Sequence, residues 1–281
     1  MAIRLTIDMF SGRPNPTIEL SSTKLPGRMK VSTAQKLLVE GTSRVARPST
    51  LGYRGIIVED TTAKGFRPRR VDEDATSVRD LLARLGKKQL ADFIIAMQPA
   101  SERAKLGRAL KTFSEWAAER ENRGRDRKKV IAACKCAPLY EPTWWNDGGQ
   151  RQLNNNCYNY STNYRTDTFA QPGQAAGQMY AALTCAAVHT AALADDVLDT
   201  KLVNKCPPEG HLVALVVAPG FDYHWYRKGR DGLWTHKPGH TPVTNVDNSG
   251  HIITDPRTAD RGPYTDFCSF MVVMHGHIKI R

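Results

Sequence analysis

The sequence predicts an α+β protein, in which a small N-terminal α+β module is followed by a helix packed on an antiparallel sheet. The alanine-rich stretch Gln174–Val197 is the clearest helix in the chain. After it, apolar and aromatic runs alternate with turn signals, which is typical of an antiparallel meander. With 281 residues the chain is long enough for two ordinary domains. We therefore predict an N-terminal module over residues 1–125 and a second domain over residues 126–281.

The N-terminal module is expected to contain two strands and several helices. The opening run IRLTIDMF alternates and ends at the turn signal SGRPNP, so it predicts a strand, and Tyr53–Asp60 predicts another. Apolar residues that recur at spacings of three and four predict helices further on. These expected helices are Ser32–Leu38, Ser77–Leu85, Lys88–Met97 and Ser101–Arg120. The polar run ENRGRDRKK at residues 121–129 is the expected linker, and no chemistry is assigned to this module.

The second domain begins with an irregular segment. Residues 134–173 are rich in Asn, Gly, Pro and Tyr, and they predict a loop system around a pocket. After the alanine-rich helix, the expected strands are HLVALVVAP, the two arms of a hairpin over Phe221–Gly239, HIITD, and the terminal run FCSFMVVMHGHIKI.

The hairpin carries one histidine on each arm. His224 and His236 lie 12 positions apart, with the turn KGRDG midway between them. A connecting loop of odd length places both side chains on one face of the sheet, whereas an even length places them on opposite faces. The interpretation of the hairpin therefore depends first on the parity of its loop.

Charge and apolar patterning restrict the partners and the location. The formal net charge of +12 predicts attraction to anionic surfaces or polymers, and much of this charge lies between Arg103 and Lys129. Nucleic acid is not expected, because no aromatic residues alternate with the basic ones there. Neither a signal peptide nor a membrane-spanning run is visible. We therefore expect a protein made in the cytoplasm, which would reach the outside through a dedicated secretion system or by lysis.

Cys157 is the candidate nucleophile. The six cysteines are too few and too scattered for a disulfide scaffold, so they are expected to be mostly free thiols. In the run NNNCYNY an asparagine is expected to cap a short helix that begins at Cys157, and a helix start lowers the pKa of a thiol. A histidine on a neighbouring strand would act as base, and a further polar residue would orient it. His224 and His236 have the order that this arrangement needs.

A cysteine that opens a helix, followed by a histidine on one strand and a polar residue on the next, resembles the papain-like NlpC/P60 and CHAP cell-wall hydrolases. The resemblance covers about residues 140–275, and the run NCYNY is more similar to the CHAP style. It implies a papain-like domain that hydrolyses amide bonds through a thioester acyl-enzyme, commonly in peptidoglycan. Cys157 would be nucleophile, His224 base and His236 orienter. The set FSGRPNP, NNCYNY, TFAQPG, HWYR and LWTHKPG also resembles poorly characterised bacterial proteins, which implies no mechanism.

Further residues are expected to contact a substrate or to replace a member of the triad. The residues expected around a cleft for sugar or peptide are Trp145, Asp147, Gln152, Tyr158, Tyr160, Trp225 and Trp234. If His236 faces away, Asn245 or Asp247 would orient His224. No cofactor and no metal are expected, although Cys134 and Cys136 leave a zinc site as the rival chemistry.

The first functional hypothesis is a cysteine hydrolase that acts on peptidoglycan or another anionic, peptide-containing polymer, in the manner of a toxin or effector. Such a protein would have an immunity or carrier protein as a further partner. One alternative is a non-enzymatic protein that binds glycans or surfaces, in which the cysteine is incidental. The other is a cysteine protease or transamidase that acts on a protein.

Overall fold

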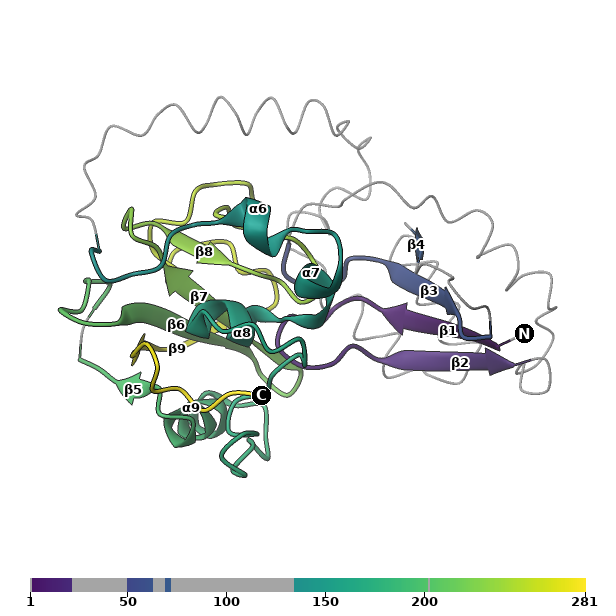
Figure 1. Ribbon diagram of the computed structural model, residues 1–281, viewed down its shortest axis with the longest axis horizontal. Coiled ribbons are helices and arrows are strands. Elements are labelled where there is room, and N and C mark those ends of the chain that lie inside the picture. Colours follow the sequence, from purple (N-terminus) through teal and green to yellow (C-terminus); the bar gives the residue numbers. More distant parts are fainter. Residues whose placement is uncertain (1, 22–49, 63–68, 72–133, 202) are drawn as a thin grey trace. The chain divides into compact units, whose positions relative to one another are not determined.

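The computed structural model shows an α+β protein, as the sequence predicts, with antiparallel sheets and short helices (Figure 1). The structure describes residues 2–21, 50–62, 69–71, 134–201 and 203–281. The chain divides into two compact units. The first unit comprises Met1–Phe10, Pro14–Pro48 and Gly52–Gln98, and the second comprises Ser11–Arg13, Ser49–Leu51 and Pro99–Arg281. The two short stretches Ser11–Arg13 and Ser49–Leu51 thus belong to the second unit.

The first unit contains a four-stranded sheet in the order β2-β1-β3-β4. Its strands are β1 (Ala2–Ile7), β2 (Thr17–Ser21), β3 (Ile56–Asp60) and β4 (Arg69–Val71). Both strands expected in this region are present, and they pair with each other in an antiparallel register. The apolar side chains that alternate along them are buried, as expected for a sheet with one face on a core. The helices expected at 32–38, 77–85, 88–97 and 101–120, and the linker at 121–129, lie outside the described residues.

A buried ion pair fixes the chain after β1. The carboxylate of Asp8 lies 2.7 Å from a guanidinium nitrogen of Arg54, and both side chains are fully buried. Asn15 donates to the same carboxylate, and its amide oxygen accepts from the backbone N–H groups of Met9 and Phe10. A buried pair is stable only when such hydrogen bonds complete it. The cluster therefore holds the turn between β1 and β2 in place.

The second unit contains a five-stranded antiparallel sheet in the order β5-β9-β6-β7-β8. Its strands are β5 (Leu198–Asp199), β6 (His211–Ala218), β7 (Asp222–Lys228), β8 (Trp234–His236) and β9 (Asp266–Val273). β6 lies at the centre and every one of its residues is buried, because both faces of the sheet are covered. The expected strand HIITD forms only an isolated bridge between Val246 and Ile252, and the last strand ends at Val273.

The two faces of this sheet pack against different parts of the chain. On the first face, Val213, Leu215 and Trp225 pack with residues of α8 (Cys157–Thr162) and α9 (Cys185–Ala194). On the second face, the alternate residues of β6 and β7 pack with Leu51 and with residues of the loop that precedes β9. Sequence neighbours in β6 and β7 therefore contribute to different cores.

Two further short helices precede α8, namely α6 (Pro142–Trp145) and α7 (Gln150–Asn154). The helix expected over Gln174–Val197 is wrong in extent, because only Cys185–Ala194 are helical. Gly173 and Gly177 have φ values of +76° and +71°. This left-handed conformation suits glycine and ends helical geometry, so residues before Thr184 form turns. Thr184 caps α9 by accepting from the backbone of Ala187.

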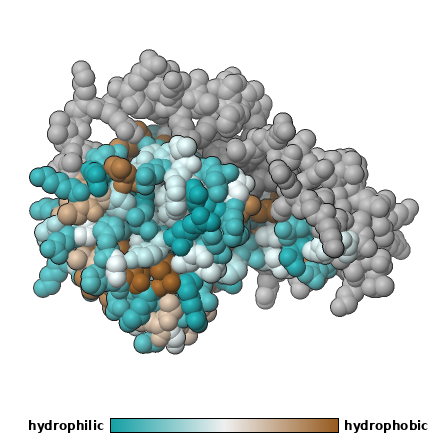
Figure 2. Space-filling view, viewed as in Figure 1, coloured by the Kyte–Doolittle hydropathy of each residue, from teal (hydrophilic) through white to brown (hydrophobic). Residues whose placement is uncertain are grey.

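The described surface in Figure 2 is mainly hydrophilic, with hydrophobic atoms gathered over the part that contains α9. Leu193 on α9 and Leu198 on β5 are among the exposed apolar side chains. Within the part of the chain that the structure describes, no helix has the length and apolar character needed to cross a membrane.

Candidate functional site

Cys157 begins helix α8, as the sequence predicts. The side chain of Asn156 caps the helix by accepting from the backbone N–H groups of Tyr158 and Asn159, at 3.0 and 3.1 Å. Asn159 accepts in return from the N–H of Asn156, which completes a capping box. The local sequence NNNCYN thus explains why the helix starts at this residue.

Burial opposes activation of the thiol at this helix start. Cys157 is fully buried in the first-face core beside Trp225. Burial raises the pKa of the Cys157 thiol well above its usual range, and the nearby charge of Asp222 raises it further. A hydrogen bond with the backbone of Trp225 and the charge of Lys237 lower it, but they do not compensate. The expected lowering of the pKa is therefore wrong, because desolvation outweighs the helix start.

The two histidines of the hairpin do meet. Lys228 pairs with Trp234, so the loop Gly229–Leu233 has an odd length and both rings project from one face. His224 Nε2 lies 2.9 Å from His236 Nδ1, and His236 Nε2 lies 3.0 Å from the carbonyl oxygen of Val246. Since a carbonyl only accepts, His236 carries its proton on Nε2 and accepts from His224 at Nδ1. Burial lowers the pKa of His236 to about 4, which keeps this ring neutral.

Cys157 lies beside β7, where its thiol interacts with the backbone of Trp225, the residue that follows His224. Cys157 packs with Tyr223 and Trp225 in the first-face core. His224 lies between these two residues in β7, so its side chain projects from the opposite face, where its ring contacts Tyr226 and Tyr264. The structure thus brings together His224 and His236. Cys157 interacts electrostatically with Asp222, whose side chain projects from the same face of β7 as His224.

Most residues expected to line a cleft are core residues. Trp145, Tyr158, Tyr160, Trp225 and Trp234 are almost completely buried. These five aromatics therefore stabilise the fold and do not present a surface to a ligand.

The two polar residues of the expected cleft lie at the start of α7. Asp147 is exposed, and its carboxylate accepts from the N–H groups of Gly149 and Gln152. These hydrogen bonds cap the helix, and they lower the pKa of Asp147 although partial burial raises it. Gln152 is half-buried and donates to the carbonyl of His240. Both side chains thus have local structural partners.

Asn245 and Asp247, the alternative residues for orienting His224, have structural partners of their own. Asp247 accepts from the backbone N–H groups of Ser249, His251 and Asp260, and so it fixes a turn. Asn245 is half-buried, and its carbonyl accepts from the backbone of Ile253. Among the described residues no group of three or more His, Cys, Asp or Glu side chains is placed to hold a metal ion.

Asp222 organises a polar cluster that the sequence interpretation missed. Its side chain is fully buried and accepts from the N–H of Ser11 at 2.6 Å, from the N–H of Arg13 at 3.1 Å and from the hydroxyl of Tyr264 at 2.5 Å. Burial raises the pKa of Asp222, and these hydrogen bonds lower it. In the sequence, SGRPNP predicts only a turn, and Asp222 lies more than 200 residues away from it.

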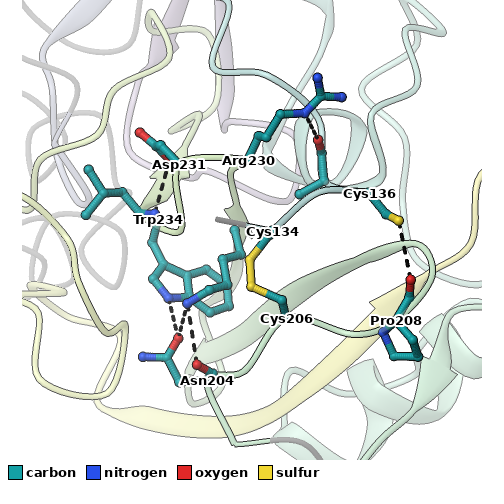
Figure 3. The surroundings of a disulfide bond; sticks show 11 residues. Cys134, Cys136, Asn204, Cys206, Pro208, Arg230, Asp231 and Trp234 are labelled. Carbon is teal, nitrogen blue, oxygen red and sulfur yellow. Dashed lines mark hydrogen bonds between the residues drawn. A yellow bond between two sulfur atoms is a disulfide. The ribbon is translucent and has the colours of Figure 1, made fainter. Parts of the chain in front are cut away.

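The cysteines form two disulfides. Cys134 is bonded to Cys206, and Cys185 on α9 is bonded to Cys268 on β9. Of the remaining two, Cys157 is buried and Cys136 is exposed. Figure 3 shows Cys136 pointing away from the neighbouring disulfide toward Pro208, whose carbonyl lies 3.3 Å from its sulfur. The expectation of mostly free thiols is therefore wrong, because the fold brings together cysteines that are 72 and 83 residues apart.

The comparisons with known proteins bear on function. No family model matches the chain, and no solved structure matches it. Over 145 residues, the chain is 48% identical to insoluble matrix shell protein 1 of Ruditapes philippinarum. The aligned residues make up 50% of this chain and 94% of that protein.

This relative overturns the enzymatic interpretation. Its name describes a matrix protein, so the expectations of a cysteine hydrolase, a peptidase, a toxin and an effector are wrong. The expected cytoplasmic location is also wrong, since the relative is named for a shell matrix. The buried thiol and the two disulfides agree with these corrections. The chain belongs to the family that includes insoluble matrix shell protein 1 of Ruditapes philippinarum.

Proposed function

We propose that this chain is a non-enzymatic structural protein of an insoluble matrix. The observation that carries the proposal is the 48% identity to a relative with that name, 94% of which is aligned with this chain. The geometry supports it, because Cys157 and the two histidines are completely buried in the second unit.

The two disulfides support a location in an oxidising compartment. Disulfides persist in extracellular proteins and are rare in the cytosol. Both of them join elements of the second unit that are distant in sequence, so each one constrains the unfolded chain. A protein that remains in a matrix benefits from such covalent constraints, because it is not renewed quickly by synthesis inside a cell.

The distribution of charge suggests how the chain binds its matrix. Residues 134–281 contain equal numbers of basic and acidic residues, so the whole positive excess of the chain lies in residues 1–133. We propose that this N-terminal region attracts an anionic matrix polymer, while residues 134–281, which contain both disulfides, have no such bias. Binding of this kind weakens as salt screens the charges.

Fractionation of the source tissue tests the structural role. Antibodies against the second unit should detect the protein in the detergent- and urea-insoluble fraction, and little of it in the cell lysate. Detection mainly in the soluble lysate would contradict the proposal.

Binding to beads tests the anionic partner. The oxidised full-length chain is expected to sediment with beads that carry poly-L-glutamate, and to be released as salt rises from about 0.05 to 0.5 M. Uncharged cellulose beads are the control. Equal retention on both kinds of bead, without dependence on salt, would exclude an electrostatic mode of binding.

A further inference from the structure

The Asp222 cluster has the features of a peptide-binding site whose ligand is a segment of this chain. The ligand is the tripeptide Ser11–Arg13, which lies more than 200 residues from Asp222 in sequence. Its backbone N–H groups converge on the buried carboxylate, as described above. The side chain of Arg13 also donates to the carbonyl of Phe221, at 2.9 Å. The site thus recognises the backbone of the segment at both ends.

The middle residue of the segment is held most closely. The carbonyl oxygen of Gly12 accepts from Asn156 at 2.7 Å and from Gln171 at 2.9 Å, and the hydroxyl of Tyr223 lies 3.1 Å away. A Cβ atom at Gly12 would lie 2.5 Å from the ring of Tyr223 and 2.6 Å from its carbonyl oxygen. The site therefore selects glycine by shape and the peptide carbonyl by hydrogen bonds.

The segment also completes the edge of the sheet. Within β7, the residues that pair with β8 are Tyr226–Lys228, at the end of the strand. Beside the beginning of β7, the hydroxyl of Ser11 lies 3.2 Å from the carbonyl of Tyr223. The carbonyl of Ser11 accepts from the N–H of Cys157, at 3.4 Å. Without the segment, a buried carboxylate and part of a strand edge would lose these partners, which is costly for any protein.

We propose that two copies of the chain exchange this segment. The Ser11–Arg13 segment of one copy then occupies the Asp222 site of a second copy, in place of that copy's own segment. Every contact between segment and site is non-covalent, so the same hydrogen bonds form whichever copy supplies the segment. Each copy carries one segment and one site. Exchange therefore makes a head-to-tail contact, which produces rings or open chains.

Open chains of copies would account for insolubility, so this inference deepens the proposed structural role and rests on it. Its test does not involve any matrix. A chain that self-associates in solution but is absent from the insoluble fraction would contradict only the proposed function. A chain that is found in the matrix but never exchanges its segment would contradict only the exchange.

Two full-length variants separate the segment from the site. In Gly12→Val the segment no longer fits, while the acceptor site remains complete. In Asp222→Asn the segment remains intact. The side-chain NH₂ group replaces one of the two carboxylate oxygens that accept from the N–H groups of Ser11 and Arg13. Mapping of the Cys134–Cys206 and Cys185–Cys268 disulfides by mass spectrometry verifies that both variants fold.

Sedimentation velocity gives the decisive result. Each variant alone is expected to remain monomeric, an equimolar mixture should form a species of twice the mass, and the wild-type chain should form larger species as its concentration rises. A mixture that stays monomeric would overturn the proposal. So would a wild-type chain that stays monomeric at every concentration.

A peptide measurement keeps the proposal testable if Asp222→Asn does not fold. A fluorescein-labelled peptide with the sequence of residues 8–16, DMFSGRPNP, is added to the Gly12→Val chain. It should bind at least about tenfold more tightly than the same peptide with valine in place of glycine, since it alone fits the site. Equal binding of the two peptides would show that the site does not recognise the segment, and this would overturn the proposal.

Discussion

The two faces of the second sheet use the same strands in different ways. On the first face, residues of β6 and β7 pack against α8 and α9, and this core contains Cys157 and Trp225. On the second face, the alternate residues pack against loops, and His224 and His236 form a buried pair there. Side chains that are adjacent in sequence thus have unrelated surroundings. The order of a cysteine and a histidine along a chain therefore does not define the surroundings of either side chain.

The largest effect on stability is expected from loss of the Cys185–Cys268 disulfide on the first face. Cys185→Ala removes the disulfide that joins α9 to β9, and it should lower the free energy of unfolding by about 4 kcal/mol, because the open unfolded chain gains entropy. Urea unfolding measures the loss. The control is Cys136→Ser at the exposed free thiol, and a similar loss in both variants would contradict this role of the disulfide.

Each face also contains a buried neutral histidine that donates to a carbonyl. Burial lowers the pKa of His236 to about 4 on the second face and that of His211 to about 3 on the first. The unfolded chain binds protons at higher pH than the folded one, so this stability is complete above about pH 6.5 and is lost as the pH falls toward 4. For His236 the loss should reach about 3 kcal/mol.

Urea unfolding at several pH values tests this acid sensitivity. His236→Gln should flatten the dependence between pH 6.5 and 4, whereas His251→Gln, at an exposed position, is the control. An unchanged dependence in His236→Gln would show that the buried pair does not contribute to it.

A smaller effect is expected from the thiol on the first face. Cys157→Ala leaves a small cavity beside Trp225 and should cost about 1–2 kcal/mol. Thermal unfolding measures this change. A loss above about 4 kcal/mol would indicate a role beyond packing.

The last prediction concerns the reactivity of the two free thiols, and no change in stability is expected from it. Iodoacetamide at neutral pH should modify the exposed Cys136 and leave the buried Cys157 unmodified in the folded protein, since only the accessible thiolate reacts. Mass spectrometry of tryptic peptides gives both rates. Faster modification of Cys157 would contradict the buried, inactive thiol that the first face contains.

Local patterns were sufficient for much of the fold. Alternation predicted β1, and apolar or aromatic runs beside turn signals predicted β3, β6 and the hairpin. The asparagines of NNNCYN predicted the start of α8, because capping depends on nearest neighbours along the chain. The helix over Gln174–Val197 was overestimated, since alanine content does not reveal that Gly173 and Gly177 adopt left-handed turns.

Contacts between residues that are far apart in the chain could not be predicted from the sequence. Neither disulfide could be inferred from cysteine spacing, because each joins residues that meet only in the folded sheet. The role of Asp222 was missed for the same reason: its partners, Ser11 and Arg13, belong to a turn at the other end of the chain.

By itself the sequence determined the α+β class and the helix start at Cys157. The first follows from hydrophobic patterning and the second from capping, and both are local. Only the tertiary structure decided that His224 and His236 share one face, that the thiol is completely buried, and that Asp222 binds the Ser11–Arg13 segment. Those outcomes depend on which element covers each face of the sheet, and this is determined by packing between residues that are distant along the chain.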